Sequence, residues 1–169
     1  APKANNGKIR IGYIGSGNPF NSSSILAFQK ALLESRIDTE RFEFHLAGSV
    51  CKTLTENTDP FIVHGLVDNL TDFYRSMDVM VNPMLGGTGL KIKSIEALAY
   101  GRPLIATVDA MVGIESDCEY HSFDNLDVVV EFINIRLNQD FLSRMTKDSI
   151  QTLTIYNSRF INSFIEIFK

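Results

Sequence analysis

Short apolar segments alternate with longer stretches in which apolar residues recur every three or four positions. The short segments predict β-strands, at residues 9–15, 42–47, 61–63, 79–81 and 103–107. Their continuous apolar character is typical of strands that are covered on both faces, as in a parallel sheet. The pattern therefore predicts an α/β fold, namely a doubly wound, Rossmann-like parallel sheet with helices on both faces.

Polar residues and glycines mark where the intervening helices begin and end. Ser22 to Ser24 offer N-caps for the helix after the first strand, and Asp68 or Asn69 offers one for the helix after the third. The helix after the fourth strand is expected from about Leu90 to Tyr100, and Gly101 ends it as the residue after the C-cap. Strands and helices thus alternate, as in right-handed crossover units.

The pattern changes after Gly113. Residues 119–123 predict one more strand, and the chain from about Asn125 onward predicts a helical C-terminal tail. The last segment, residues 152–169, carries too many aliphatic and aromatic side chains for an isolated helix in water. We expect it to pack on this domain or on a neighbouring one.

Composition narrows the class of protein. The 169 residues favour one domain, and 44% hydrophobic residues supply a substantial core. A net charge of −4 argues against a nucleic-acid partner, because such domains usually carry a basic excess. Cys51 and Cys118 lack a CxxC partner and the histidines lack metal-ligand spacing, so no metal is expected, while a disulfide stays open. The absence of a long apolar run predicts no transmembrane segment and favours a cytoplasmic protein.

Ligands of doubly wound sheets bind in the crevice beyond the carboxyl ends of the strands. The loops expected there are 15–21, 48–52, 63–66, 82–89 and 107–113. The first and the fourth of these loops contain glycines that let the main chain approach a ligand closely.

The loop after the first strand runs from Gly15 and Ser16 to Asn21 and enters a helix, whose free amides favour an anion. Gly12, Gly15 and Gly17 follow the spacing GxxGxG, whereas a dinucleotide-binding fingerprint has the spacing GxGxxG. The second strand also ends without the acidic residue that would hold the ribose of NAD. An oxidoreductase is therefore disfavoured, and a plain turn with serine caps stays open as the alternative for this loop.

A second glycine-rich loop, residues 86–89, leads into the helix that carries Lys91, Lys93 and Glu96. Lysines in a first turn oppose the helix dipole, so their placement favours a bound anion such as a pyrophosphate. Glu96 lies three residues after Lys93, and its carboxylate could accept hydrogen bonds from the vicinal hydroxyls of a ribose. An ordinary surface pair beside a tight turn stays open, whereas a P-loop is excluded because GxxxxGK[ST] is absent.

Residues 86–107, GGTGLKIKSIEALAYGRPLIAT, resemble the signature of group 1, GT-B fold retaining glycosyltransferases. That signature has a glycine-rich loop, a lysine, and a glutamate followed by Ala-x-Ala-x-Gly-x-Pro. Residues 61–83, FIVHGLVDNLTDFYRSMDVMVNP, are similar to another segment of the family, and residues 11–21 are similar to the first strand and loop of its C-terminal domain. The resemblance spans roughly residues 9–115. It implies a C-terminal domain that binds a nucleoside diphosphate-sugar, with UDP or GDP as the nucleotide.

The resemblance also implies roles for single residues. Glu96 would bind the ribose, and Lys93, with Lys91, would neutralise the diphosphate. The first glutamate of the family falls at Thr88, so main-chain amides would contact the donor sugar instead. His64 to Leu66 would lie beside the base, with Leu70 against it. The further donor-binding positions are Gly15, Ser16, Asn21, His64, Gly65, Leu66, Leu70, Gly87, Thr88, Gly89 and Leu90. No cofactor is implied and no catalytic side chain is assigned, because amides and lysines would stabilise the leaving diphosphate.

A domain organisation follows from the same resemblance. Residues 1–8 would be a linker remnant and residues 9–169 a single donor-binding domain, with an N-terminal acceptor domain elsewhere in the protein. The isolated domain would be inactive, and any peripheral membrane association would belong to the other domain. Surface polysaccharide or glycoconjugate synthesis is the usual setting of the family. Thr88 keeps open the alternative of a degenerate nucleotide-binding domain that acts as a partner-binding module.

Overall fold

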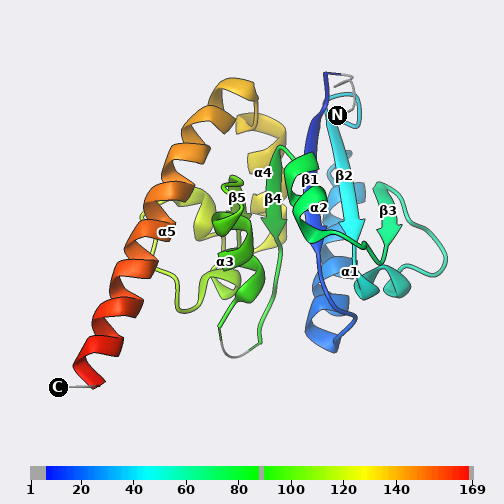
Figure 1. Ribbon diagram of the computed structural model, residues 1–169. Coiled ribbons are helices and arrows are strands. Elements are labelled where there is room, and N and C mark those ends of the chain that lie inside the picture. The colour runs from blue at the N-terminus through cyan, green and yellow to red at the C-terminus, as the bar shows by residue number, and fades with distance from the viewer. Residues whose placement is uncertain (1–6, 88–89, 168–169) are drawn as a thin grey trace.

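The computed structural model describes residues 7–87 and 90–167, so residues 1–6 of the predicted linker and the predicted donor-binding residues Thr88 and Gly89 lie outside the described chain. One parallel sheet of five strands has the order β3-β2-β1-β4-β5 (Figure 1). The strands are β1 (Ile9–Ile14), β2 (Phe42–Ala47), β3 (Phe61–Gly65), β4 (Val79–Asn82) and β5 (Leu104–Ala106). Each lies within two residues of a predicted strand.

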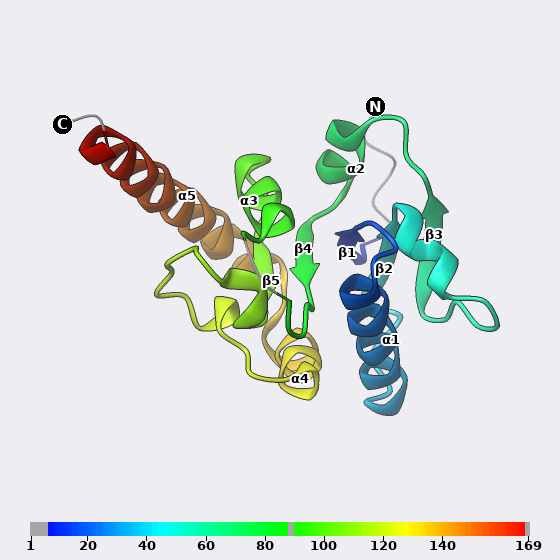
Figure 2. The same ribbon diagram turned by 90° about the horizontal axis from the view of Figure 1, so that it is seen from below.

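Helices cover both faces of the sheet. They are α1 (Pro19–Glu34), α2 (Leu70–Ser76), α3 (Ile92–Ala99), α4 (Leu126–Arg136) and α5 (Gln139–Ile167). Figure 2 shows α1 and α4 on one face and α2 and α3 on the other. The predicted doubly wound, Rossmann-like architecture with a helical C-terminal tail is therefore confirmed.

Each face of the sheet has its own core. On the side of α1 and α4, the rings of Phe28, Phe44 and Phe61 pack with centroids 6.2 to 6.4 Å apart. On the side of α2 and α3, Phe73 and Leu98 belong to a second, smaller cluster. The two cores fix the carboxyl edge of the sheet from both sides, and that edge positions the candidate site.

Two local predictions are wrong. Helix α1 begins at Pro19 with Asn18 as its N-cap, not at Ser22 to Ser24, because the fixed φ of proline suits a first helical turn.

Residues 119–123 form no strand. Glu119–His121 is a 3-10 turn, and Phe123 alone pairs with Thr107 in a single bridge. The turn allows both Tyr120 and His121 to point inward, whereas consecutive residues of a strand point to opposite faces.

The end of α3 matches the prediction. Gly101 has φ 65°. Its amide donates to the main-chain oxygen of Leu98 at 2.9 Å, and the amide of Arg102 donates to the main-chain oxygen of Ala97 at 3.0 Å. This pair of bonds is a Schellman motif, which needs the left-handed conformation that glycine adopts readily.

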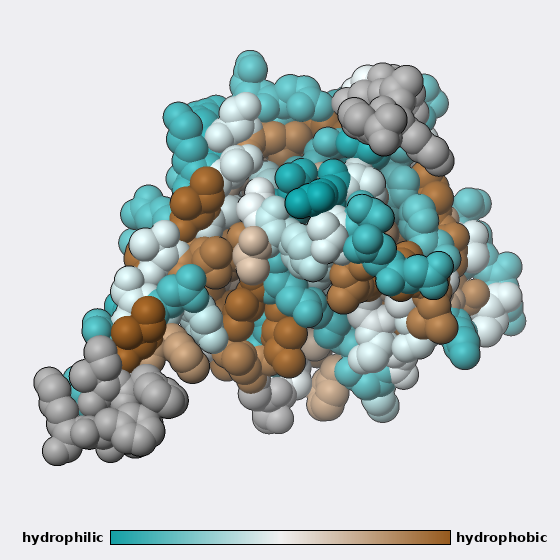
Figure 3. Space-filling model, in the orientation of Figure 1, coloured by the Kyte–Doolittle hydropathy of each residue, from teal (hydrophilic) through white to brown (hydrophobic). Residues whose placement is uncertain are grey.

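The two halves of α5 have different surroundings. Met145 is fully buried in the core on the side of α1 and α4, and Leu153 and Tyr156 pack against the smaller core. Beyond them the helix runs away from the sheet, and Phe160 and Ile161 are 62% and 56% exposed (Figure 1). Figure 3 shows apolar side chains, in brown, along this outer half. The expectation that the segment packs on this domain therefore holds for its first part only.

Candidate functional site

The candidate site lies where the loops after β1 and β4 leave the sheet in opposite directions. β1 leads to α1 on one face and β4 leads toward α3 on the other, so a crevice opens between two central strands. Two cavities along this crevice share Ile92 and Lys93. We name them by size: the larger cavity has a volume of about 410 Å³ and the smaller cavity about 230 Å³.

The larger cavity gathers many of the predicted nucleoside contacts. Its lining is Ile14, Gly15, Ser16, Gly48, Ser49, Leu66, Val67, Leu70, Ile92, Lys93 and Glu96. Aliphatic side chains supply its apolar surface, and the two formal charges of the lining are one carboxylate and one ammonium. Such a lining suits a flat base attached to a polyhydroxyl group and an anion.

Stacked tyrosines hold Glu96 in place. Oε2 of Glu96 accepts a hydrogen bond from the hydroxyl of Tyr74 at 3.1 Å, and the rings of Tyr74 and Tyr100 stack with centroids 4.4 Å apart. Burial and then the Glu96 carboxylate raise the pKa of Tyr74, so its hydroxyl stays protonated and donates. A carboxylate has about four lone-pair sites, so Glu96 keeps acceptors for the two hydroxyls of a ribose.

Lys93 connects the two cavities. Its Cε lies 2.9 Å from the position that a Cβ on Gly15 would take, so the lysine stem runs over the first loop. Burial lowers the pKa of Lys93, the Glu96 carboxylate opposes this, and the charge of Lys91 adds to the lowering. A half-buried ammonium beside a second lysine favours a bound anion, because the anion would offset the cost of desolvation.

Two asparagines brace the first loop. The side chain of Asn18 accepts from the amide of Asn21 at 2.9 Å, and Nδ2 of Asn21 donates to the main-chain oxygen of Ser16 at 2.8 Å. Asn21 is fully buried and is not among the residues that line either cavity. The structure therefore gives Asn21 a bracing role, whereas Gly15 and Ser16 reach the cavity as expected.

The first and second strands meet at Gly48 in a very close main-chain contact. Gly48 has φ 89°, and a Cβ at this position would lie 2.2 Å from the main-chain oxygen of Gly15. The next residue, Ser49, accepts a hydrogen bond from the amide of Gly17 at 2.9 Å. The floor of the larger cavity thus depends on a residue without a side chain.

Positive φ angles shape the glycine-rich loop. Gly86 and Gly87 have φ 72° and 86°, in the left-handed region that glycine adopts without strain. Lys91 is only 5% exposed, and its Nζ donates to the main-chain oxygen of Gly87 at 3.1 Å. The two predicted lysines therefore lie at different places: Lys93 lines both cavities, whereas Lys91 lines only the smaller of the two.

Polar ties from the segment after β5 hold the same loop. The amide of Gly86 donates to Oδ2 of Asp109 at 2.6 Å, and the hydroxyl of Thr107 donates to the main-chain oxygen of Met84. Asp109 belongs to a short 3-10 turn, η2 (Asp109–Met111). The loop is therefore anchored from the neighbouring strand.

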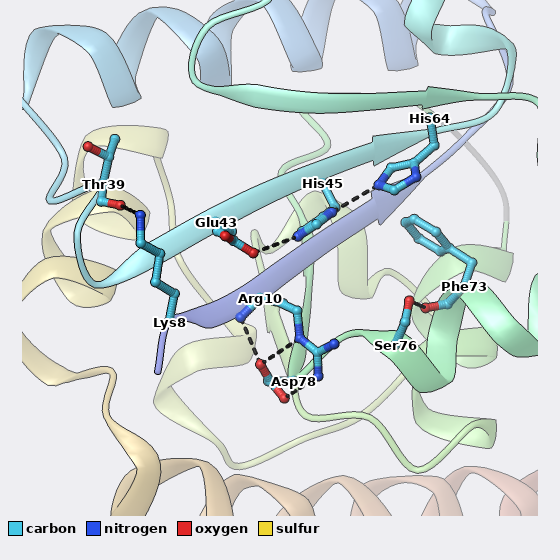
Figure 4. A network of polar contacts seen from close by, with 9 residues as sticks. All are labelled: Lys8, Arg10, Thr39, Glu43, His45, His64, Phe73, Ser76 and Asp78. Carbon is cyan, nitrogen blue, oxygen red and sulfur yellow. Dashed lines mark hydrogen bonds and ion pairs between the residues drawn. The ribbon is translucent and has the colours of Figure 1, made fainter. Parts of the chain in front are cut away.

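The side chain of His64 belongs to a polar network and does not line either cavity. Its Nε2 lies 2.9 Å from Nδ1 of His45, and Nε2 of His45 lies 3.5 Å from Oε2 of Glu43 (Figure 4). Leu66 and Leu70, which follow His64, line the larger cavity. The structure places the His64 ring in this polar network, and the place of residues 64–66 beside the base stays a prediction.

Several residues of the site were not singled out from the sequence. They line the cavities or hold their walls, and the main ones are Asn18, Phe20, Ser49, Asn82 and Asp109. An apolar residue in a polar glycine-rich loop is a local signal that could have indicated Phe20. Asp109 gives no such signal, because its contact with Gly86 joins residues 23 positions apart.

The geometry agrees with comparison to known families. Residues 8–122 match the family described as glycosyl transferases group 1. The chain belongs to this family. The matched region contains all five strands, both cavity-forming loops and the Lys93–Glu96 segment, so the site of this group 1 glycosyl transferase lies within it. Comparison with the curated proteins gave no match.

Solved structures share the fold at low sequence identity. S. aureus TarM, solved with Fondaparinux, alpha-GlcNAc-glycerol and UDP, has a TM-score of 0.63 and 16% identity over 96% of this chain and 36% of its own. Anabaena HepE, in complex with UDP and glucose, has a TM-score of 0.66 and 11% identity over 95% of this chain and 49% of its own. A glycosyltransferase from Rickettsia africae has a TM-score of 0.66 and 15% identity over 98% and 49%. This chain therefore spans less than half the length of these three proteins.

Residues 7–87 and 90–167 contain neither a membrane-spanning helix nor a cluster of metal ligands. None of the helices there is both long and apolar enough to span a membrane. No group of three or more His, Cys, Asp or Glu residues in that part of the chain is placed to hold a metal ion.

Proposed function

We propose that this chain binds a nucleoside diphosphate-sugar and serves as the donor half of a glycosyl transferase. The observation that carries the proposal is the larger cavity, where Glu96 and Lys93 stand beside an apolar wall. Glu96 accepts the ribose hydroxyls, Lys93 neutralises the diphosphate, and Leu66 and Leu70 contact the base. Membership of the group 1 family supports the same assignment.

The chemistry asked of these residues is stabilisation of a leaving group. Cleavage of a glycosyl–phosphate bond leaves negative charge on the nucleoside diphosphate. Lys93, Lys91 and main-chain amides of the glycine-rich loop stabilise that charge without having to reorganise. UDP is favoured among the nucleotides, because TarM and HepE were both solved with UDP.

The acceptor belongs to a second domain in this proposal. The chain spans 36% to 49% of the related structures, which is consistent with a C-terminal donor domain formed by residues 9–169. The exposed outer half of α5, with Phe160 and Ile161, offers apolar surface for the acceptor domain. We place the enzyme in the cytoplasm, with a hexosyl donor and a surface polysaccharide or glycoconjugate as product. The isolated domain is inactive in transfer.

Calorimetric titration of the chain with UDP, GDP, ADP, TDP and NAD tests the proposal. One nucleoside diphosphate should bind, and Glu96→Ala should weaken it about tenfold, because hydrogen bonds to a charged group contribute roughly 1.5–3 kcal/mol. Glu34→Ala, on exposed α1 surface, is the matched control and should bind like the wild type. Equal affinity of Glu96→Ala and the wild type would exclude the ribose assignment.

A partner-binding module without catalysis is the second candidate. The exposed apolar side chains on the outer half of α5 favour it, as does Thr88 at the position of the family's first glutamate. This candidate predicts that none of the five nucleotides binds and that Phe160→Asp, not Glu96→Ala, abolishes association with the partner domain.

A further inference from the structure

Phe20 is an aromatic side chain that the cores of the protein do not use. It follows Pro19 at the start of α1, and 53% of its surface is exposed. Its ring lies 3.8 Å from the positions that Cβ atoms on Gly86 and Gly87 would take. The ring therefore covers the two glycines of the loop and forms one wall of the smaller cavity.

Besides Phe20, the smaller cavity is lined by polar, charged and aliphatic residues. Its lining is Asn18, Phe20, Asn82, Met84, Gly87, Leu90, Lys91, Ile92 and Lys93. Nζ of Lys91 has three hydrogens, and its hydrogen bond to the main-chain oxygen of Gly87 uses one of them. A group that enters this cavity thus meets an aromatic ring, the buried ammonium of Lys91 and two asparagines, a combination that matches a sugar ring with one C–H face and several hydroxyls.

The order of the two cavities along the crevice determines which part of the donor would bind in each cavity. With the nucleoside in the larger cavity, the diphosphate lies at Lys93, which both cavities share. The group attached to the outer phosphate then enters the smaller cavity. The geometry points to Phe20 as a specificity-determining residue, and we propose that its ring stacks on the glycosyl group of the donor. This inference rests on the proposed function.

The test compares a nucleotide with its own sugar conjugate. The nucleoside diphosphate that binds the wild type is titrated first, followed by its glucose, galactose, N-acetylglucosamine and glucuronate conjugates. With the best conjugate, Phe20→Ala should lose about fivefold to tenfold in affinity, while its affinity for the bare nucleotide stays within about twofold. Phe20→Tyr should retain both affinities, because its ring keeps the same stacking face. Leu33→Ala is the control, since Leu33 is an exposed residue of the same helix, 46% exposed and outside both cavities.

Each outcome bears on one of the two proposals. Binding of no nucleotide by the wild type would refute the proposed function, and the inference with it. If the nucleotide binds but Phe20→Ala weakens nucleotide and conjugate equally, the ring supports the loop and the stacking proposal is wrong. It is also wrong if Phe20→Ala changes neither affinity, or if none of the four sugars improves on the bare nucleotide.

Discussion

The larger and the smaller cavity share Lys93, yet they are built from different parts of the chain. Side chains on α3 and on the segment after β3 shape the larger cavity, with Glu96 and Leu66 as examples. The smaller cavity is shaped by main chain at positive φ and by ties from the segment after β5, such as Asp109. The proposed donor site thus combines a larger cavity that depends mainly on side chains with a smaller one that depends also on loop conformation.

The largest effect should come from the close main-chain contact beneath the larger cavity. In Gly48→Ala the new Cβ would meet the main-chain oxygen of Gly15 at 2.2 Å, so β1 and β2 must separate at their ends. We expect a loss of about 3–5 kcal/mol in the free energy of unfolding, measured by urea denaturation. Gly101→Ala is the control, because Gly101 also has positive φ but no atom within 4 Å, and it should cost only about 1 kcal/mol. Similar losses for the two variants would show that φ strain alone explains both.

The second-largest effect should come from loss of the hydrogen bond between Gly86 and Asp109, which holds the loop at the smaller cavity. Asp109→Ala leaves the amide of Gly86 without its acceptor, and we expect about tenfold weaker binding of the sugar conjugate, since a hydrogen bond to a charged group contributes roughly 1.5–3 kcal/mol. Asp109→Asn keeps an acceptor oxygen and should restore most of the affinity. Equal affinities of the two variants in calorimetry would mean that the tie does not position the loop.

The smallest predicted effect is a pH dependence centred on Lys93. Burial lowers the pKa of this ammonium, so its charge is lost at a lower pH than that of an exposed lysine. Affinity for the nucleoside diphosphate should therefore fall roughly twofold to threefold between about pH 7.5 and pH 9.5, because the neutral amine attracts the anion less. Lys93→Arg stays charged across this range and should flatten the profile. A wild-type affinity that is constant over the same range would contradict the assignment of Lys93 to the diphosphate.

The elements of the sheet could be predicted because each strand is a continuous apolar run between polar loops. The 3-10 turn at Glu119–His121 could not, since its conformation depends on distant partners: Tyr120 donates to Asp148, and His121 contacts Ser116. The start of α1 was misplaced for a different reason. Asn18 followed by Pro19 is itself a helix-start signal, and the neighbouring serines concealed it.

The same distinction holds for the candidate site: residues close together in one motif could be predicted, and residues from separate loops could not. Glu96 and Lys93 were predicted because they lie close together in one motif, and the structure brings them into one cavity. The walls contributed by Phe20 and Asp109 depend on the folding of separate loops onto Gly86, which no spacing in the sequence records. His64 is a different case: it was predicted as part of the loop after β3, whereas the structure places it in β3 itself, with its ring against His45.

The hydrogen bond from Tyr74 to Glu96 also couples the site to the intrinsic tyrosine fluorescence of the protein. The chain contains no tryptophan and only five tyrosines, and one of these donates to the carboxylate assigned to the ribose while stacked on another, Tyr100. A phenol that donates to a carboxylate emits weakly, so a ribose that donates to the remaining acceptors of Glu96 should weaken the Tyr74 hydrogen bond and change the intrinsic ultraviolet emission of the protein. Occupancy could then be followed without any label, and Tyr74→Phe would remove the signal.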